Sequence, residues 1–508
     1  MFGVAKSALK PAGLLSKSPR FVRHVASQSV SQSKAEGDIS AVFPSLSGVV
    51  MEPLPERFTE IKCQLMIQGN EERLTESWQR LLKQLAAENE IVKQRGSDII
   101  PQIEFEELRN APTDFVKEIK KRGVAVIKGV VPENEARDYK NQVEEYVKRN
   151  PSTKAFPPDN PQIFELYWSP AQMKARLNAN LISAQTSLMN IWHSNDREAL
   201  ISTSLPLTYA DRVRIRQPGD NQFALGPHVD GGSVERWEPN GYGLGGVYDK
   251  VFQGQWEEYD PWESSARIPA VTDLYQGPGG CSMFRMFQGW LGLSHTSPRE
   301  GTLLVNPLLQ LATAYFLLRP FFDPVRSPGG FAAGDSTRYL SSENWKLKSA
   351  SEMDSALHGA NPGSSQELND VLHPHLNLEH SMVHVPKIKP GDYVVWHCDT
   401  IHAVDQVHTG KTDSSVMYIP VCPVTELNAK YLAKQRETFA AGVPAPDFPG
   451  GKGESEHTGR ATIESVIGEA DELGLSSMGL SKLSNPEGEI LPGAQKMMRR
   501  ANQLLGFA

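Results

Sequence analysis

A histidine and an aspartate stand two residues apart in a glycine-rich segment of the chain. They are His228 and Asp230, in the run Gly226-Pro-His-Val-Asp-Gly-Gly232. In an extended chain, side chains at i and i+2 point to the same side, so one imidazole and one carboxylate are directed at one point. The two glycines that follow leave room for a turn and for a ligand to come close. The pair therefore supplies two ligands of a 2-His-1-carboxylate triad, the arrangement that holds non-haem Fe(II) and leaves other positions open.

A downstream segment offers the missing second histidine. Within Pro390-Gly-Asp-Tyr-Val-Val-Trp-His-Cys-Asp-Thr-Ile-His-Ala-Val404, the first three residues indicate a turn and the next four a buried strand. His402 is the predicted third ligand, because it follows a short loop where the next strand can start. His397 is the competitor, and we favour for it a place in the barrel wall or behind the ligands. His384 and His408 are further candidates in a chain with 13 histidines.

The two segments together resemble the Fe(II)/2-oxoglutarate-dependent dioxygenase superfamily, in particular its phytanoyl-CoA-hydroxylase-like and clavaminate-synthase-like members. Within it, the chain is most similar to a fungal and bacterial family known as a domain of unknown function. The likeness extends from residue 100 to residue 480 and rests on four further runs: Phe164-Glu-Leu-Tyr-Trp-Ser-Pro-Ala-Gln172, Arg214-Ile-Arg-Gln-Pro-Gly219, Phe284-Arg-Met-Phe-Gln-Gly-Trp290 and Gly301-Thr-Leu-Leu-Val-Asn-Pro307.

This resemblance implies a fold, an activity and a set of site residues. The fold is an all-β core with flanking helices, a double-stranded β-helix (jelly roll, cupin-like). The activity is that of an Fe(II)- and 2-oxoglutarate-dependent oxygenase acting on a small molecule. His228, Asp230 and His402 are then both the metal ligands and the catalytic centre. A carboxylate ligand at Asp230 favours hydroxylation over halogenation.

The binding site for 2-oxoglutarate departs from the superfamily pattern. Many members carry an arginine shortly after the distal histidine, but the run from Val404 to Tyr418 has none, and its Lys411 is typical of a solvated turn. A planar guanidinium suits a dicarboxylate because it binds both oxygens. Three residues are predicted to take this role: Arg285, which interrupts an apolar run; Arg216, which shares a strand face with Arg212 and Arg214; and Ser415. The alternative for the arginine stripe is an exposed sheet edge.

Composition excludes several other classes of protein. The 508 residues are 39% hydrophobic and 22% charged with a net charge of -8, which argues against nucleic-acid binding. The four cysteines form no close pair, so neither a zinc-finger spacing nor a disulfide framework is present, and a reducing interior fits. The most apolar stretch, 303–318, is too short and too interrupted to span a bilayer. A small-molecule substrate is the expected partner, and oligomeric state is not predicted.

The first 35 residues have a composition of their own. No acidic residue precedes Glu36, serine is frequent, and apolar residues are interspersed with a set of basic ones: Lys6, Lys10, Lys17, Arg20, Arg23 and Lys34. This pattern is typical of a mitochondrial transit peptide over 1–35 and predicts a location in the matrix. A disordered basic tail is the alternative.

The remaining chain divides into three predicted parts. Residues 36–100 are a linker and an N-terminal helix, 101–430 the jelly-roll domain, and 431–508 a helical extension. Insertions at 234–280 and 323–380 enlarge the domain. The first insertion follows the proposed ligands directly and is aromatic-rich, so it is either a lid or pocket wall or a surface excursion packed on its own aromatic residues.

Two other functions use the same residues. A redox-silent metal-dependent hydrolase would hold Zn2+ with the same three ligands to activate water. A non-catalytic jelly-roll protein would bind a metabolite without turnover. The absence of an arginine after His402 keeps both alternatives open.

Overall fold

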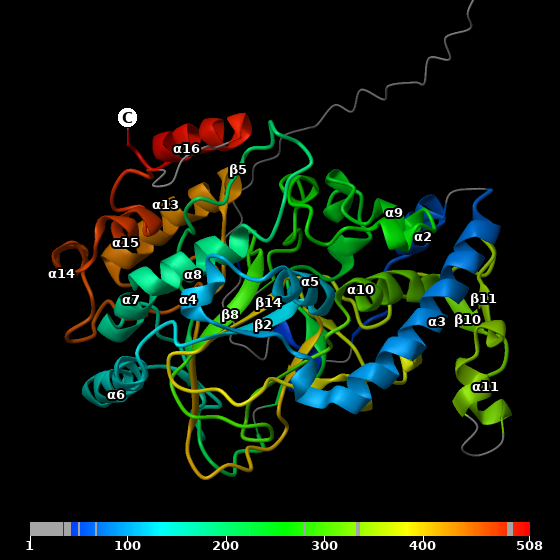
Figure 1. The fold of residues 1–508 in the computed structure, drawn as a ribbon, viewed down its shortest axis with the longest axis horizontal. Coiled ribbons are helices and arrows are strands. Elements are labelled where there is room, and N and C mark those ends of the chain that lie inside the picture. The colour runs from blue at the N-terminus through cyan, green and yellow to red at the C-terminus, as the bar shows by residue number, and fades with distance from the viewer. Residues whose placement is uncertain are drawn as a thin grey trace, which may run out of the picture. The chain divides into compact units, whose positions relative to one another are not determined.

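Two mainly antiparallel sheets lie at the centre of the fold and carry the segments singled out in the sequence (Figure 1). The computed structural model describes residues 34, 42–48, 51–66, 69–222, 224–277, 280–331, 336–484 and 491–507, and Lys34–Ala508 forms one unit. The predicted transit peptide lies outside the described residues except for Lys34.

The larger sheet has eight strands within the described ranges, in the order β1-β2-β14-β8-β16-β6-β4-β3. Apart from the parallel pair β1 and β2, neighbouring strands run antiparallel. Their bounds are β1 Gln102–Glu104, β2 Val124–Lys128, β3 Ala155–Phe156, β4 Ile163–Phe164, β6 Val213–Arg216, β8 Phe287–Gly292, β14 Tyr393–His397 and β16 Ser414–Tyr418.

The smaller sheet is antiparallel and has the order β12-β7-β15-β9-β13. Its strands are β7 His228–Val229, β9 Leu303–Val305, β12 Gln366–Glu367, β13 Val383–His384 and β15 His402–Val404. From β6 to β9 and again from β13 to β16, successive strands alternate between the two sheets. Two short pairs complete the described strands: β10 Phe322–Pro324 with β11 Trp345–Leu347, and β5 Ile201–Ser202 with β17 Val424–Thr425.

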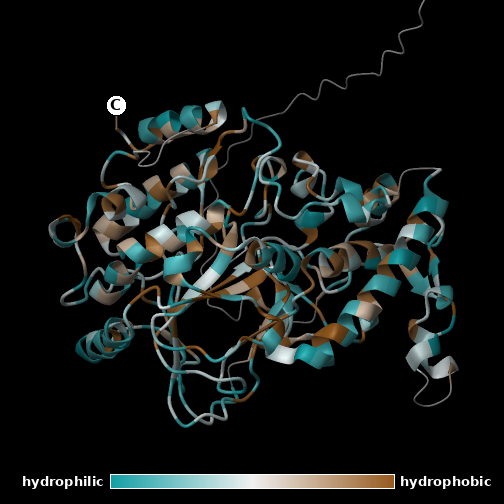
Figure 2. Cartoon of the chain, viewed as in Figure 1, coloured by the Kyte–Doolittle hydropathy of each residue, from teal (hydrophilic) through white to brown (hydrophobic). Residues whose placement is uncertain are grey.

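Side chains along the central strands alternate between the two faces of the larger sheet, and so the apolar core is divided into two clusters. On β14, Val394 and Trp396 belong to the apolar cluster that includes the smaller sheet, whereas Tyr393 and Val395 belong to the cluster on the other face, with helix α8. Both faces of the sheet are therefore covered, which is why the strand is a continuous apolar run in the sequence. In Figure 2 the central strands are largely brown, whereas the helices alternate between teal and brown as amphipathic elements do.

A long helix lies within 36–100, where the sequence predicts an N-terminal helix. Helix α3 (Glu71–Arg95) buries one apolar face, and its Trp78 stacks on Phe322 at a ring-centroid distance of 4.4 Å. Helix α5 (Thr113–Arg122) ends at Gly123, whose φ of 70° is favourable for glycine at a helix C-terminus. The other helices before β6 are α1 Pro44–Ser47, α2 Arg57–Leu65, α4 Phe105–Leu108, α6 Glu133–Arg149, α7 Pro170–Arg176 and α8 Ala179–Met189.

Helices are more prominent than an all-β core implies, so the fold is mixed α/β with antiparallel sheets. The remaining helices are α9 Asp249–Phe252, α10 Leu309–Leu318, α11 Ser336–Leu340, α12 Leu378–Ser381, α13 Glu426–Ala441, α14 Ile463–Glu469, α15 Glu472–Ser477 and α16 Pro492–Leu504. The last four make the region after 425 helical. Among the described residues, no helix is both long enough and apolar enough to cross a bilayer.

Candidate metal centre

His228, Asp230 and His402 come together although 174 residues separate the outer two (402 − 228 = 174). The smaller sheet places them, because His228 on β7 and His402 on β15 are direct cross-strand partners. The imidazole centroids lie 4.1 Å apart. The carboxylate of Asp230 lies near the Nε2 atoms of both rings, with Oδ1 3.8 Å from His228 Nε2 and Oδ2 3.5 Å from His402 Nε2. The three side chains therefore converge on one point, as the sequence predicts.

Backbone carbonyls fix the orientation of both imidazoles. Nδ1–H of His228 donates to the Gly226 carbonyl at 2.7 Å, and Nδ1–H of His402 donates to the Thr400 carbonyl at 3.0 Å. A carbonyl can only accept, so the proton is on Nδ1 and the lone pair is on Nε2. Histidine ligands of metals are commonly oriented in this way. Both Nε2 atoms face Asp230 and are ready to bind a cation.

The protonation states suit a divalent metal. Burial and the neighbouring His402 lower the pKa of His228 to about 4, so the ring is neutral at pH 7. Burial alone would raise the pKa of the Asp230 carboxyl, but contact with His402 and the charges of His228 and Arg285 outweigh burial and hold that pKa well below its ordinary value. The site thus presents a neutral His228, the Nε2 atom of His402 and one carboxylate, a set of ligand types that iron and zinc both accept.

The loop after Asp230 depends on its two glycines and on contacts from distant segments. Gly231 and Gly232 have φ values of 74° and 99°, which side-chain-bearing residues rarely adopt. Ser365, in the second insertion, donates its hydroxyl to Asp230 Oδ1 at 2.9 Å. Phe43 packs its edge against the His228 ring at 4.7 Å. Neither Ser365 nor Phe43 was singled out in the sequence, because nothing near them in the chain marks them.

The triad opens into a cavity of about 140 Å³ lined by both sheets. Gln288 on β8 and Trp396 on β14 reach its wall, and so does Arg214 on β6. Three nitrogen atoms of these side chains, Gln288 Nε2, Trp396 Nε1 and Arg214 Nε, are buried without a hydrogen-bond partner among the described residues. Because a buried donor without a partner costs free energy, such a group of donors indicates a ligand rich in acceptor oxygens.

Arg285 lines the same cavity, and its binding of 2-oxoglutarate stays a prediction. It forms no hydrogen bond or ion pair with any residue in the ranges that the structure describes. Arg214 is also buried in the wall, where Nη2 donates only to the Gly301 carbonyl, at 3.1 Å. The arginine stripe is therefore not an exposed sheet edge, since Arg212, Arg214 and Arg216 are all buried.

Arg216 and Ser415 do not reach the cavity. Arg216 pairs with Asp220, with Nε 2.5 Å from Oδ2, and its other nitrogens donate to carbonyls, including that of Asp405. Ser415 is on the opposite face of β16, and its hydroxyl donates to Asp413 Oδ2 at 2.5 Å. Both predictions are wrong in placement, because Asp220 and Asp413, carboxylates close to them in the chain, bind these side chains. Lys411 is exposed, as expected of a turn.

The competing histidines are engaged elsewhere. His397, Cys398 and Asp399 form a second group of ligand-type side chains. His397 Nε2–H donates to the Pro261 carbonyl and Nδ1 accepts from the Asp399 backbone N–H, both at 3.0 Å, while the ring stacks on Trp192. His397 is thus held by other partners in the interior and is not one of the three converging side chains. Of the other two candidates, His384 Nε2 contacts Asp405 at 2.6 Å, and His408 Nδ1 accepts from the Gly410 N–H.

A family model decides which proteins this chain is related to. The Gig2-like model matches residues 52–480, most of the chain. The chain belongs to the Gig2-like family. The fungal and bacterial resemblance recognised in the sequence is thereby confirmed.

Relatives of this Gig2-like chain come from fungi and from bacteria. The uncharacterized protein YbiU of Escherichia coli K12 is 32% identical over 391 residues, which is 74% of this chain and 85% of that protein. The crystal structure of GlcNAc Inducible Gene 2 (DUF1479) from Candida albicans superposes with a TM-score of 0.78 at 30% identity, covering 90% of this chain and 96% of that one. A Salmonella typhimurium LT2 protein, provisionally described as an oxidoreductase, superposes with a TM-score of 0.70 at 29% identity, covering 84% and 99% of the two chains.

Proposed function

We propose that this Gig2-like protein is an Fe(II)- and 2-oxoglutarate-dependent oxygenase that hydroxylates a small molecule. The observation that carries the proposal is the triad itself: two imidazole Nε2 atoms oriented by backbone carbonyls, one ionised carboxylate, and a cavity in front of them. The provisional description of the Salmonella relative as an oxidoreductase agrees with it.

The strand order supports the same reading. Strands β6, β16, β8 and β14 belong to the larger sheet and β7, β15, β9 and β13 to the smaller one. The chain alternates between the two sets from β6 to β9 and from β13 to β16, and residues of both sheets line the cavity. We infer that these eight strands form the double-stranded β-helix expected of this superfamily, with β1 to β4 and the helices as additions.

The residues present fit both the metal and the cosubstrate. Bound together, Fe(II) and 2-oxoglutarate supply the oxidation: with O2, 2-oxoglutarate becomes succinate and CO2 while one oxygen atom enters the substrate as a hydroxyl. His228, Asp230 and His402 would hold the iron. The donors of Arg214, Gln288 and Trp396, together with the Arg285 guanidinium, would neutralise and orient the dianion.

The proposal is tested by anaerobic titration of the protein with Fe(II) and then 2-oxoglutarate, followed by the visible charge-transfer band of a chelated 2-oxo acid. The band is expected in the wild type and in His397→Gln but not in His402→Ala. Iron binding without a band would refute the oxygenase and favour a hydrolase or a metabolite-binding protein. A band that survives in His402→Ala would refute the ligand assignment.

A matched pair of variants locates the far carboxylate of 2-oxoglutarate. Arg214→Gln and Arg285→Gln each remove one guanidinium from the cavity and keep a side chain that can donate. We expect Arg214→Gln to weaken 2-oxoglutarate binding more, because Arg214 is the more buried of the two and its Nε has no partner. Equal affinity in the wild type and both variants would show that neither guanidinium binds the cosubstrate.

We also propose that residues 1–35 direct the protein to the mitochondrial matrix. The support is the composition of this segment alone. A fusion of residues 1–35 to a fluorescent protein in a eukaryotic cell tests it, with the basic residues replaced by glutamine as the control. Diffuse fluorescence from the unchanged segment would refute the proposal.

A further inference from the structure

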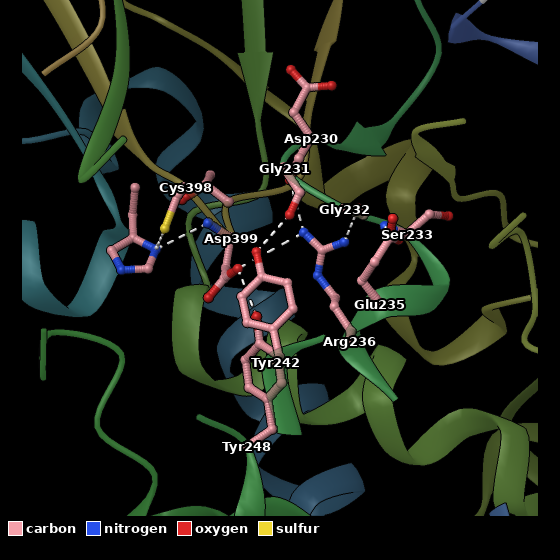
Figure 3. Close-up of polar contacts among 12 residues, drawn as sticks. Asp230, Gly231, Gly232, Ser233, Glu235, Arg236, Tyr242, Tyr248, Cys398 and Asp399 are labelled. Atoms are coloured by element: carbon pink, nitrogen blue, oxygen red, sulfur yellow. Dashed lines mark hydrogen bonds and ion pairs between the residues drawn. The ribbon is translucent and has the colours of Figure 1, made fainter. Parts of the chain in front are cut away.

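Three successive carbonyls of the loop that carries Asp230 accept hydrogen bonds from one insertion. Arg236 donates to the carbonyls of Asp230, at 2.8 Å, and Gly232, while the Tyr242 hydroxyl donates to that of Gly231 at 2.5 Å. Figure 3 shows both side chains directed at this backbone from the side opposite the Asp230 carboxylate. The insertion therefore supports the ligand loop from behind.

The other side of Arg236 faces the loop that leads to His402. Nη2 of Arg236 lies 3.8 Å from Asp399 Oδ1, and both side chains are fully buried. Asp399 also accepts from the hydroxyl of Tyr248 at 2.9 Å (Figure 3). It accepts from Nη2 of Arg267 as well, at 2.6 Å. Asp399 stands three residues before His402, so one buried ion pair joins the two segments that carry the ligands.

A guanidinium suits this place for a geometric reason. Its planar group donates to the carbonyls of Asp230 and Gly232 and at the same time faces the Asp399 carboxylate. A lysine ammonium, on a flexible side chain, would hold these partners with a less fixed geometry. Tyr242 also stacks near it, with the Arg236 guanidinium carbon 5.7 Å from the ring centroid. Both charges are buried, and loss of Asp399 would leave two buried guanidinium groups, those of Arg236 and Arg267, without this carboxylate, so the pair resists separation of the two loops.

We propose that Arg236 and Asp399, with Tyr242, are positioning residues that keep Asp230 and His402 in metal-binding geometry before a metal arrives. This rests on the proposed metal site. It assigns a role to the first insertion, 234–280: an internal support of the triad. The second insertion contributes separately through Ser365.

Tyr242→Phe is the sharpest test, because the chain offers a matched control. Tyr393 is equally buried and also donates its hydroxyl to one backbone carbonyl, that of Ile419 at 2.6 Å, but it makes no contact with the ligand loop. Zn(II) affinity of the apo-protein is measured by calorimetry and unfolding by urea. We expect both variants to lose stability to a similar degree and only Tyr242→Phe to bind Zn(II) more weakly. Arg236→Lys should weaken Zn(II) binding about 10- to 100-fold, as removal of groups that orient metal ligands commonly does.

Hydrogen exchange in the apo-protein gives a readout that needs no metal. Peptides covering 226–236 and 397–404 should exchange faster in Tyr242→Phe than in Tyr393→Phe. Equal Zn(II) affinity and equal exchange in the two variants would overturn the positioning role. If Tyr242→Phe exchanges faster than Tyr393→Phe but the wild type binds no metal, the coupling between the insertion and the two loops would stand, and the proposed function would be refuted instead.

Discussion

Replacement of Gly232 by alanine tests how strictly the ligand loop is defined. The φ of Gly232 is 99°, a conformation that L-residues rarely adopt. An added Cβ would lie 3.1 Å from the Thr272 carbonyl oxygen and 3.2 Å from Tyr242 Cε2, closer than ordinary van der Waals contact on both sides. The substitution therefore combines backbone strain with two tight contacts.

The expected magnitude follows from these two costs. A non-glycine residue in such a conformation costs roughly 1–3 kcal/mol, and the crowding adds about 1 kcal/mol more. We expect the free energy of unfolding of Gly232→Ala to fall by about 2–4 kcal/mol. If the loop shifts to relieve the crowding, Asp230 moves with it, so Zn(II) affinity should fall as well.

Gly226→Ala is the control, since an added Cβ there would meet nothing within 4 Å and its φ is not positive. Urea unfolding and Zn(II) calorimetry of both variants are the assays. Gly226→Ala should match the wild type or gain up to about 1 kcal/mol of stability, because alanine restricts the unfolded chain. The reasoning is refuted if Gly232→Ala unfolds and binds Zn(II) as Gly226→Ala does.

Three other outcomes follow from buried polar groups. Ser365→Ala removes the hydroxyl that donates to Asp230, so Zn(II) affinity should fall about tenfold. Ser365→Thr keeps a hydroxyl and should retain the wild-type affinity. An equal loss of Zn(II) affinity in both variants would point to packing instead. Burial and the charge of Arg319 lower the pKa of His375 to about 3, so the folded protein resists a protonation that the unfolded chain accepts near pH 6.5. Stability should therefore fall as pH decreases from 6.5 toward 3, by about 1.4 kcal/mol per pH unit for this group, and His375→Gln should reduce that slope in urea titrations between pH 7 and 5. In the chain that retains residues 1–35, Lys34→Met leaves the buried carboxylate of Asp447 and the partly buried one of Asp273 without their ammonium. Unfolding should become easier by about 3–5 kcal/mol, and an unchanged urea midpoint would show that the contact contributes nothing.

The triad could be predicted because each part of it has a local signature. The spacing of His228 and Asp230 sets both side chains on one side of an extended chain, and His402 follows a turn, a strand and a short loop. Helix α3 and strand β14 were likewise predictable. A helix that buries one face has apolar residues at helical spacing, and a strand that buries both faces is a continuous apolar run.

The residues proposed to bind the cosubstrate were only partly predictable. The alternation of side chains along a strand predicts the face on which a residue lies, but not the partner that it binds. Arg214 and Arg216 share a strand face, yet Asp220 and distant carbonyls take up Arg216 while Arg214 Nε remains unpaired. The link between Arg236 and Asp399 spans 163 residues (399 − 236 = 163) and has no local signature at all. Contacts of this kind become visible only when the insertion is seen packed behind the ligands.

The ligand types of the triad have a consequence for the cell. Two oriented imidazoles and a carboxylate bind first-row divalent ions in the general order of increasing affinity from Mn(II) and Fe(II) through Co(II) and Ni(II) to Cu(II), with Zn(II) weaker than Cu(II). These three ligand types alone give no means of rejecting the tighter-binding ions. Iron occupancy would then depend on the supply of each ion in the compartment where the chain folds, and mismetallation is the expected fate of protein folded where zinc or copper is plentiful.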